Sequence, residues 1–268
     1  MADKLQYRIT GNFTEGGMAL LRNIMLSDGS RALLRELRQK HFWRLKVRRR
    51  FIQGVRIRAE ITPHPNLVNS LELGNRLFRP YEIIEYIPAD NLKSLMNNRS
   101  EALRFHGEDI LREAARGLAE VHRHNFLHLD VKPENFLVDT RDRLNPAVKL
   151  TDFDLACTPE QAQKTRPMGT PAYMAPEQIN TRISLKASDV FAFGTMAYLV
   201  LSGRFPFSGN SEAQTMRNQA DEKVLPRPLS EFSLPISTKM ERTIMRCLAK
   251  RVRERYSDMT AVLNALLS

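Results

Sequence analysis

The spacing of the apolar residues changes near Pro88, and this change constrains the fold more than any other feature of the chain. Residues 5–37 form short alternating segments separated by glycines, a pattern typical of hairpin strands. Between Ile110 and Val121, apolar residues recur every three or four positions, which predicts a long amphipathic helix. A strand-rich beginning and a helix-rich remainder predict an α+β fold of two lobes. The expected lobes are residues 1–88, with one main helix near residues 43–60, and residues 89–268.

The composition is that of a globular protein, with 42% apolar and 26% charged residues, and it excludes a disordered or fibrous chain. The two cysteines, Cys157 and Cys247, are too few for a disulfide framework. The longest apolar run, residues 190–201, is too short to cross a bilayer and predicts a buried helix. The first residues carry no apolar signal core, so we expect a cytoplasmic protein without a transmembrane segment.

Positive charge is concentrated in one segment. The chain has 41 Lys and Arg against 30 Asp and Glu, which gives a formal net charge of +11. Eleven of the basic residues and a single acid, Glu36, lie within residues 31–58, so this segment alone carries +10. An acidic protein or an anionic surface would complement it, whereas a solvated basic helix would need no partner. We expect no nucleic-acid ligand, and the sequence does not decide between a bound partner and a solvated helix.

Polar residues that suit phosphoryl transfer follow the long helix. The segment HLDVKPEN places Asp130, Lys132 and Asn135 in one loop, and Asp152 follows a predicted strand seventeen residues after Asn135. A carboxylate can orient an attacking hydroxyl, and a lysine can neutralise a transferring phosphoryl group. Amide and carboxylate oxygens are ligands that Mg²⁺ prefers. These four residues therefore predict a phosphoryl-transfer site.

These motifs make the chain resemble the eukaryotic-type (Hanks-type) serine/threonine protein kinases. HLDVKPENFLV is similar to the catalytic loop, residues 152–154 to the metal-binding DFG motif, and GTPAYMAPE (residues 169–177) to the end of the activation segment. The resemblance covers essentially the whole chain and places Arg255 where the family pairs an arginine with Glu177. It implies the bilobal protein-kinase fold, ATP and Mg²⁺ as cofactors, and a protein hydroxyl as the acceptor.

The resemblance also implies a role for each matching residue. Asp130 would orient the hydroxyl, Lys132 would stabilise the transferring phosphoryl group, and Asn135 with Asp152 would bind Mg²⁺. Thr170 would help to position the protein substrate. The residues matched to the nucleotide site are Gly16 and Gly17 of the glycine-rich loop, Arg35, the gatekeeper Ile84, and Glu85 and Ile87 of the adenine-binding hinge.

The N-terminal lobe departs from the family pattern. Arg35 replaces the lysine that contacts the nucleotide phosphates, and Gly54 stands where its glutamate partner is expected. The lysine–glutamate ion pair is therefore absent in both members. Asp154 replaces the DFG glycine, and Leu129 replaces the arginine that precedes the catalytic aspartate. Of the three glycine positions in the phosphate-covering loop, Gly16 alone is kept, with Gly17 beside it.

Two functions follow from this mixture. The retained catalytic-loop and metal-binding residues favour an active serine/threonine kinase that transfers the ATP γ-phosphate with a nonstandard nucleotide clamp. The departures favour a pseudokinase, a binding, scaffold or allosteric module with weak or no catalysis. A small-molecule phosphotransferase is disfavoured, because the KPEN and GTPAYMAPE segments build a platform for peptide substrates in the family.

Overall fold

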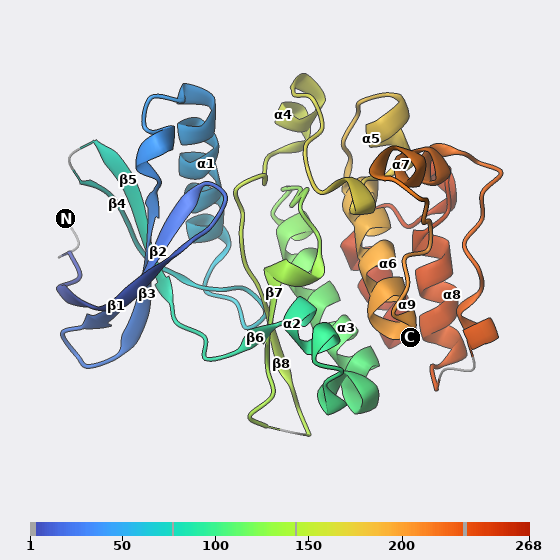
Figure 1. The fold of residues 1–268 in the computed structure, drawn as a ribbon, viewed down its shortest axis with the longest axis horizontal. Coiled ribbons are helices and arrows are strands. Elements are labelled where there is room, and N and C mark those ends of the chain that lie inside the picture. Colours follow the sequence, from blue (N-terminus) through green and yellow to red (C-terminus); the bar gives the residue numbers. More distant parts are fainter. Residues whose placement is uncertain (1–3, 77, 143, 233–234) are drawn as a thin grey trace.

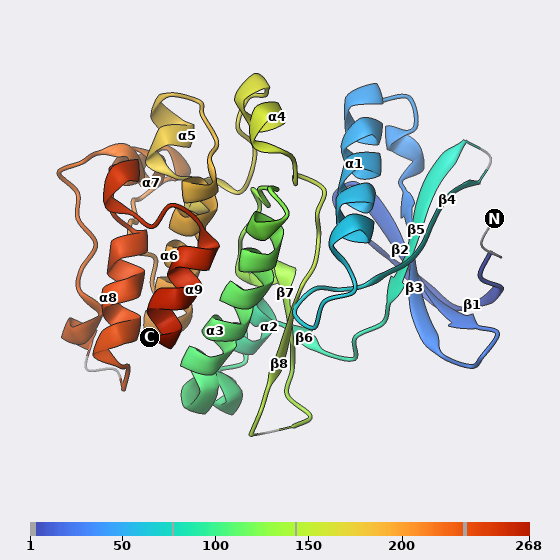
Figure 2. The same ribbon diagram turned by 180° about the vertical axis from the view of Figure 1, so that it is seen from behind.

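A computed structural model describes residues 4–76, 78–142, 144–232 and 235–268. A β-sheet with one long helix forms one end of the molecule, and a larger group of helices forms the other (Figure 1). The long helix α3 (Glu101–Arg123) and a small second sheet lie between the two, as the view from behind also shows (Figure 2). This arrangement confirms the predicted α+β fold class.

The sheet at the N-terminal end is antiparallel, with strand order β1-β2-β3-β5-β4. Its strands are β1 (Tyr7–Glu15), β2 (Ala19–Leu26), β3 (Arg31–Leu37), β4 (Ser70–Arg76) and β5 (Arg79–Glu85). Ile24, Leu34 and Ile83 belong to a small buried core on this sheet. The register between β3 and β5 sets Arg35 opposite Glu82, so two opposite charges lie side by side inside the sheet.

Helix α1 (Leu45–Ile61) is the main helix predicted near residues 43–60, and it packs beside β4 and β5. Its buried residues recur at helical spacing and include Phe51, Gly54 and Arg58. Among the described residues no side chain caps its N-terminus, and its first turn contains no acidic residue. The positive end of the helix dipole therefore lies among basic residues.

The helical part is built around α6 (Lys186–Ser202), which is the buried helix predicted from the apolar run. Helices α3 and α8 and the C-terminal helix α9 pack against it. Of these, α8 spans Thr238–Cys247 and α9 spans Met259–Leu267. The other helices of this part are α2 (Leu92–Asn97), α4 (Pro159–Lys164), α5 (Pro176–Asn180) and α7 (Glu212–Ala220). The sequence did not predict α2, α4 and α5, because elements this short cannot show a 3.6-residue period. Within the described ranges, no helix has both the length and the apolar character needed to cross a bilayer.

The second sheet places the predicted phosphoryl-transfer loop. Its strands are β6 (Asp90–Asn91), β7 (Phe136–Asp139) and β8 (Ala147–Leu150), in that order. The loop of residues 128–135 lies between α3 and β7 in the chain and leads directly into β7. Asp152 follows β8. Because β7 and β8 pair antiparallel, the start of β7 and the end of β8 are neighbours. Asn135 and Asp152 are therefore brought to the same end of this hairpin.

Candidate active site

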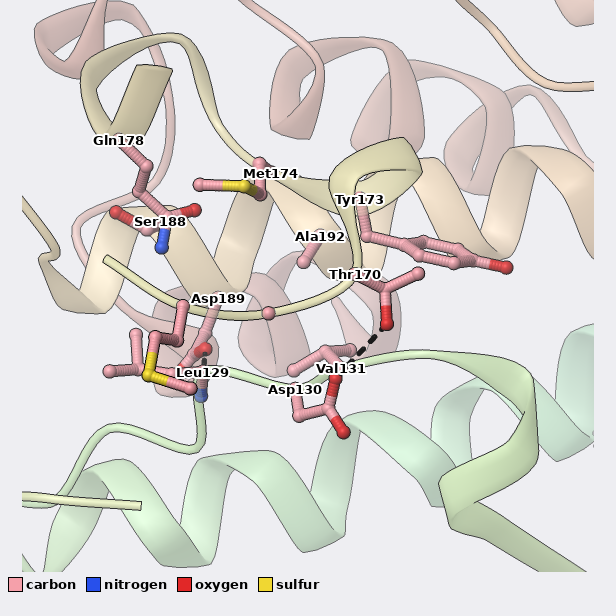
Figure 3. A pocket seen from close by; sticks show the side chains of 12 residues that line it. Leu129, Asp130, Val131, Thr170, Tyr173, Met174, Gln178, Ser188, Asp189 and Ala192 are labelled. Carbon is pink, nitrogen blue, oxygen red and sulfur yellow. Dashed lines mark hydrogen bonds between the residues drawn. The ribbon is translucent and has the colours of Figure 1, made fainter. Parts of the chain in front are cut away.

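Asp189, near the start of α6, holds the backbone of the catalytic loop (residues 128–135) in place (Figure 3). Its Oδ2 accepts a hydrogen bond from the His128 amide at 2.7 Å, and its Oδ1 accepts one from the Leu129 amide at 2.8 Å. His122 Nε2 lies 3.0 Å from the same carboxylate. Leu129 has φ of 62°, a left-handed conformation that branched side chains rarely adopt. Asp189 therefore stabilises a strained turn immediately before Asp130.

Asp130 is the centre of a group of short polar contacts. Lys132 Nζ donates to Asp130 Oδ2 at 2.7 Å, and Asn135 Nδ2 donates to the same oxygen at 3.1 Å. Thr170 Oγ1 donates to Asp130 Oδ1 at 3.3 Å, a contact that is drawn in Figure 3. Lys132 Nζ also lies 3.4 Å from Thr170 Oγ1. Four residues predicted from the sequence thus form one constellation around a single carboxylate.

These side chains open onto a cavity of about 520 Å³ whose walls come from both the first sheet and the helical part. The predicted site residues on its wall are Gly16, Gly17, Arg35, Ile84, Asp130, Lys132, Asn135, Asp152 and Thr170. Among the described residues, Glu85 and Ile87 contribute no side chain to this wall. The Glu85 carboxylate instead accepts from Lys149 Nζ and from the Asn69 amide, each at 2.7 Å. An adenine contact through the Glu85 and Ile87 main chain stays a prediction.

The turn between β1 and β2 covers one side of the cavity. The Gly16 amide donates to the Ala19 carbonyl at 2.8 Å, which closes the turn. Arg38 Nη1 donates to the Gly16 carbonyl at 2.9 Å, and His41 Nε2 lies 3.2 Å from the Gly17 carbonyl. Side chains that follow β3 therefore hold this loop, in addition to its own strands.

Arg35 is a buried cation that contacts three carboxylates. Its guanidinium donates a hydrogen bond to Asp154 and lies 3.5 Å from Asp152 and 3.7 Å from Glu82. Burial would lower the pKa of Arg35, but the charges of Asp154, Asp152 and Glu82 outweigh it and raise that pKa above its ordinary value. The missing helix glutamate therefore does not leave this cation without a partner.

Arg58 joins α1 to the sheet. It is almost fully buried, and its Nη1 donates to Glu82 Oε2 at 2.6 Å. Its guanidinium also lies over the ring of Phe153, 5.1 Å from the ring centre. In the family pattern the cation belongs to the strand and the anion to the helix, whereas here the helix carries the cation Arg58 and β5 carries the anion Glu82.

The oxygen donors near Asp130 fit a Mg²⁺ site. Asn135 uses its side-chain nitrogen to contact Asp130, which leaves its amide oxygen for a ligand. The Asp152 side chain is 42% exposed and lines the cavity. Burial would raise the pKa of Asp152, but Arg35 and Arg58 lower it below its ordinary value, so the group stays ionised. Two oxygen donors suit Mg²⁺, which keeps phosphate and water oxygens in its shell.

The sequence did not identify three contributors to the site as partners of one another. From the sequence, Asp154 is a departure from the DFG motif and Arg58 is one of the cations of the basic segment; neither pattern indicates the contacts with Arg35 and Glu82. Glu82 carried a partial signal, because it stands between Tyr81 and Ile83 in the largely apolar stretch YEIIEYI, and a charge buried in such a strand needs a partner. The expected contact between Arg255 and Glu177 is present, with nitrogen–oxygen distances of 2.5 and 3.0 Å.

Comparison with known proteins agrees with this geometry. The family described as the protein kinase domain matches residues 19–267. The serine/threonine-protein kinase Pkn1 of Myxococcus xanthus is 29% identical over 97% of this chain and 38% of its own length. PkaB of Streptomyces coelicolor, also named a serine/threonine-protein kinase, is 31% identical over 76% of this chain and 50% of its own. The chain thus spans half or less of the length of these relatives.

Proposed function

Because the chain belongs to the protein kinase family, we propose that it is a serine/threonine protein kinase, which transfers the γ-phosphate of ATP to a protein hydroxyl. One observation carries this proposal: Lys132, Asn135 and Thr170 all contact the Asp130 carboxylate at the wall of one cavity. Such mutual geometry is what phosphoryl transfer needs, since most of its catalysis is positioning and charge neutralisation.

Each residue of this constellation has a separate task. Asp130 orients the acceptor hydroxyl. Thr170 donates a hydrogen bond to Asp130 Oδ1 and helps to position the protein substrate. Lys132 neutralises charge on the transferring group. Asn135 and Asp152 would hold Mg²⁺, which would supply charge neutralisation at the nucleotide phosphates.

The nucleotide clamp that we propose is nonstandard. Arg35 supplies the positive charge of the missing lysine, and Asp154 supplies the counter-charge of the missing helix glutamate. Arg58 and Glu82 tie α1 to the sheet with the two charges exchanged between helix and strand. This pairing keeps the Arg35 guanidinium 3.5 Å from Asp152, where its positive charge would add to that of a bound Mg²⁺ in neutralising nucleotide phosphates.

A pseudokinase is the second candidate function, and one observation favours it. The Arg35 guanidinium is shared among Asp152, Asp154 and Glu82, which leaves less of its charge for a nucleotide. A chain of this kind would use the fold to hold a partner and would transfer little or no phosphate.

Two measurements separate these functions. The first is the thermal shift that ATP induces with and without Mg²⁺, in wild type and Asp152→Ala. The kinase proposal expects a shift that needs Mg²⁺ and disappears in Asp152→Ala. The second is transfer of labelled phosphate by wild type and Asp130→Asn. Asp130→Asn should bind nucleotide like wild type but lose most of the transfer.

A wild-type chain that transfers no label sensitive to Asp130→Asn contradicts the kinase proposal. Little Mg²⁺-dependent stabilisation by ATP in the same experiment assigns the chain to the pseudokinases. Retained binding of ATP in Asp152→Ala would contradict the metal-ligand role of Asp152 alone.

The proposed partners are a protein substrate and, at the basic segment of residues 31–58, an acidic protein or an anionic surface. The structure divides this segment. Arg35 and Arg58 are buried in the clamp, whereas Lys40, Arg44, Lys46, Arg49 and Arg56 are exposed. We also propose a cytoplasmic location, because the reaction consumes ATP.

A further inference from the structure

A hollow of about 480 Å³ lies between the β4–β5 hairpin and the segment that precedes α1. Figures 1 and 2 both show the ends of β4 and β5 beside this segment. We call the hollow the aromatic groove; its lining residues are Glu36, Gln39, Phe42, Trp43, Arg76 and Arg79. It is separate from the cavity that contains Asp130.

The aromatic groove has an exposed apolar edge. Trp43 is 86% exposed, and its ring meets the Phe42 ring edge-on, with 4.8 Å between the ring centres. Leu45, two residues later, is 66% exposed. Large apolar side chains gathered on a surface mark an interaction site more often than isolated ones do. Tryptophan in particular is enriched where proteins bind other proteins.

The charge of the groove is positive. Arg76 and Arg79 lie on its wall, and neither forms a salt bridge with an acidic residue in the described part of the chain. The one carboxylate on the wall, Glu36, lies 3.6 Å from Arg22 and is partly neutralised by it. The exposed cations Lys40, Arg44, Lys46 and Arg49 belong to the same segment as Trp43.

These observations select one kind of occupant. A bilayer presents its charges in a plane, whereas these rings and guanidinium groups line a hollow of about 480 Å³. A second copy of the chain would bring the same positive surface against itself. A nucleic acid would carry phosphates toward the Glu36 carboxylate on the wall. A peptide with apolar and acidic side chains can satisfy both the rings and the guanidinium groups.

We propose that the aromatic groove binds an acidic segment of a partner protein. An apolar side chain of that segment packs against Trp43 and Phe42, and its carboxylates pair with Arg76 and Arg79. Of the two partners proposed for the basic segment, an acidic protein and an anionic surface, this inference selects the acidic protein. It does not depend on phosphoryl transfer, so its failure and the failure of the kinase proposal are distinguishable.

The test uses the fluorescence of Trp43, which is the only tryptophan of the chain. The full chain is titrated with a short synthetic peptide of Glu and Leu, at low and at high salt. We expect the Trp43 emission to shift to shorter wavelength, because the indole ring leaves water. Affinity should weaken at high salt. The double variant Arg76→Glu, Arg79→Glu should raise the Kd about tenfold or more.

A charge-matched control is the double variant Arg242→Glu, Arg253→Glu. Arg242 is exposed on α8, Arg253 is exposed in the 3-10 turn Val252–Glu254 that follows it in the chain, and the change in net charge is the same. The control should bind the peptide like wild type. Both double variants should keep the melting temperature and the phosphoryl transfer of wild type, because none of the four residues lines the cavity of Asp130.

Several results would overturn the proposal. One is a Trp43 emission spectrum that does not change when the peptide is added. Another is an equal loss of peptide affinity in the Arg76→Glu, Arg79→Glu variant and in the control variant. A stronger response to phosphatidylserine vesicles or to a single-stranded oligonucleotide would assign the surface to a membrane or a nucleic acid instead. A concentration-dependent shift without peptide would assign it to a second copy of the chain.

Discussion

Gly54 of α1 lies directly against the main chain of Phe153. A methyl group at position 54 would fall 2.8 Å from the carbonyl carbon of Phe153 and closer still to its oxygen. A side chain at this position must therefore displace either the helix or the segment of residues 152–154. The glycine that replaces the family glutamate thus allows α1 to pack closely on residues 152–154. In this packing the Asp154 carboxylate contacts the Arg35 guanidinium.

Gly54→Ala is expected to reduce both stability and activity. In an ordinary helix interior this change stabilises by up to about 1 kcal/mol. Here it should lower the melting temperature, because the new methyl group meets main-chain atoms. Displacement of residues 152–154 should lower kcat/KM about ten- to a hundredfold. Thermal unfolding and a steady-state phosphorylation assay measure the two effects.

Gly107→Ala provides the matched control in α3. The nearest atom to a methyl group there is Leu201 Cδ2 at 3.4 Å, the end of a flexible side chain. This variant should keep full activity and a melting temperature equal to or above that of wild type. Equal behaviour of the Gly54 and Gly107 variants would contradict the importance of the Phe153 contact.

Asp189→Asn should disturb the catalytic loop without changing the nucleotide site directly. An asparagine offers one acceptor oxygen where two amides, those of His128 and Leu129, now donate to two oxygens. Leaving one buried amide without a partner costs about 1–3 kcal/mol. We expect kcat to fall by more than tenfold, with a smaller change in the KM for ATP. A fall confined to KM would contradict the positioning role of Asp189.

The stability difference between wild type and Asp189→Asn should depend on pH in one direction. Burial opposes ionisation of Asp189, but His122 and the loop amides lower its pKa below 3.8. Its stabilising contribution is therefore complete above pH 3.8 and is lost as the pH falls through the folded-state pKa. Urea unfolding from neutral to acidic pH should show a constant difference in the free energy of unfolding between the two proteins near neutrality. This difference should shrink below pH 3.8.

The spacing of apolar residues predicted the fold class, and the constellation around Asp130 was predicted because its residues lie in short contiguous motifs. The sequence did not predict the ion pairs that join Arg35, Arg58, Glu82 and Asp154, because these residues come from four separate segments. Arg58 illustrates the reason. Within the basic segment of residues 31–58 it resembles a solvated cation, and its burial follows from how α1 packs against Phe153 and β5. Spacing along the chain carries no information about such a contact.

The buried pair of Arg58 and Glu82 should behave differently from a surface pair. Arg58→Met leaves Glu82 buried with its nearer cation removed, and we expect a loss of about 3–5 kcal/mol in the free energy of unfolding. The double variant Arg58→Met, Glu82→Gln should lose less than the sum of the two single variants. Urea unfolding of the four proteins measures this coupling.

Arg251→Met, which breaks the exposed pair with Glu222 at 2.8 Å, is the control for that cycle. It should have no measurable effect on unfolding, because solvent screens an exposed pair. Strict additivity in the Arg58 and Glu82 cycle would show that the two side chains do not stabilise the fold as a pair.

We propose that the Asp154 carboxylate is the functional counter-charge of Arg35. Replacing Asp154 by the glycine of the family motif tests this pairing most directly. The measurement is kcat/KM for phosphate transfer by wild type and Asp154→Gly. We predict a loss of about tenfold or more, because the variant removes the nearest counter-charge of a buried arginine. If Asp154 were merely a defect in the metal-binding motif, the glycine would leave kcat/KM unchanged or raise it. An unchanged or higher kcat/KM in Asp154→Gly would contradict the pairing of Asp154 with Arg35.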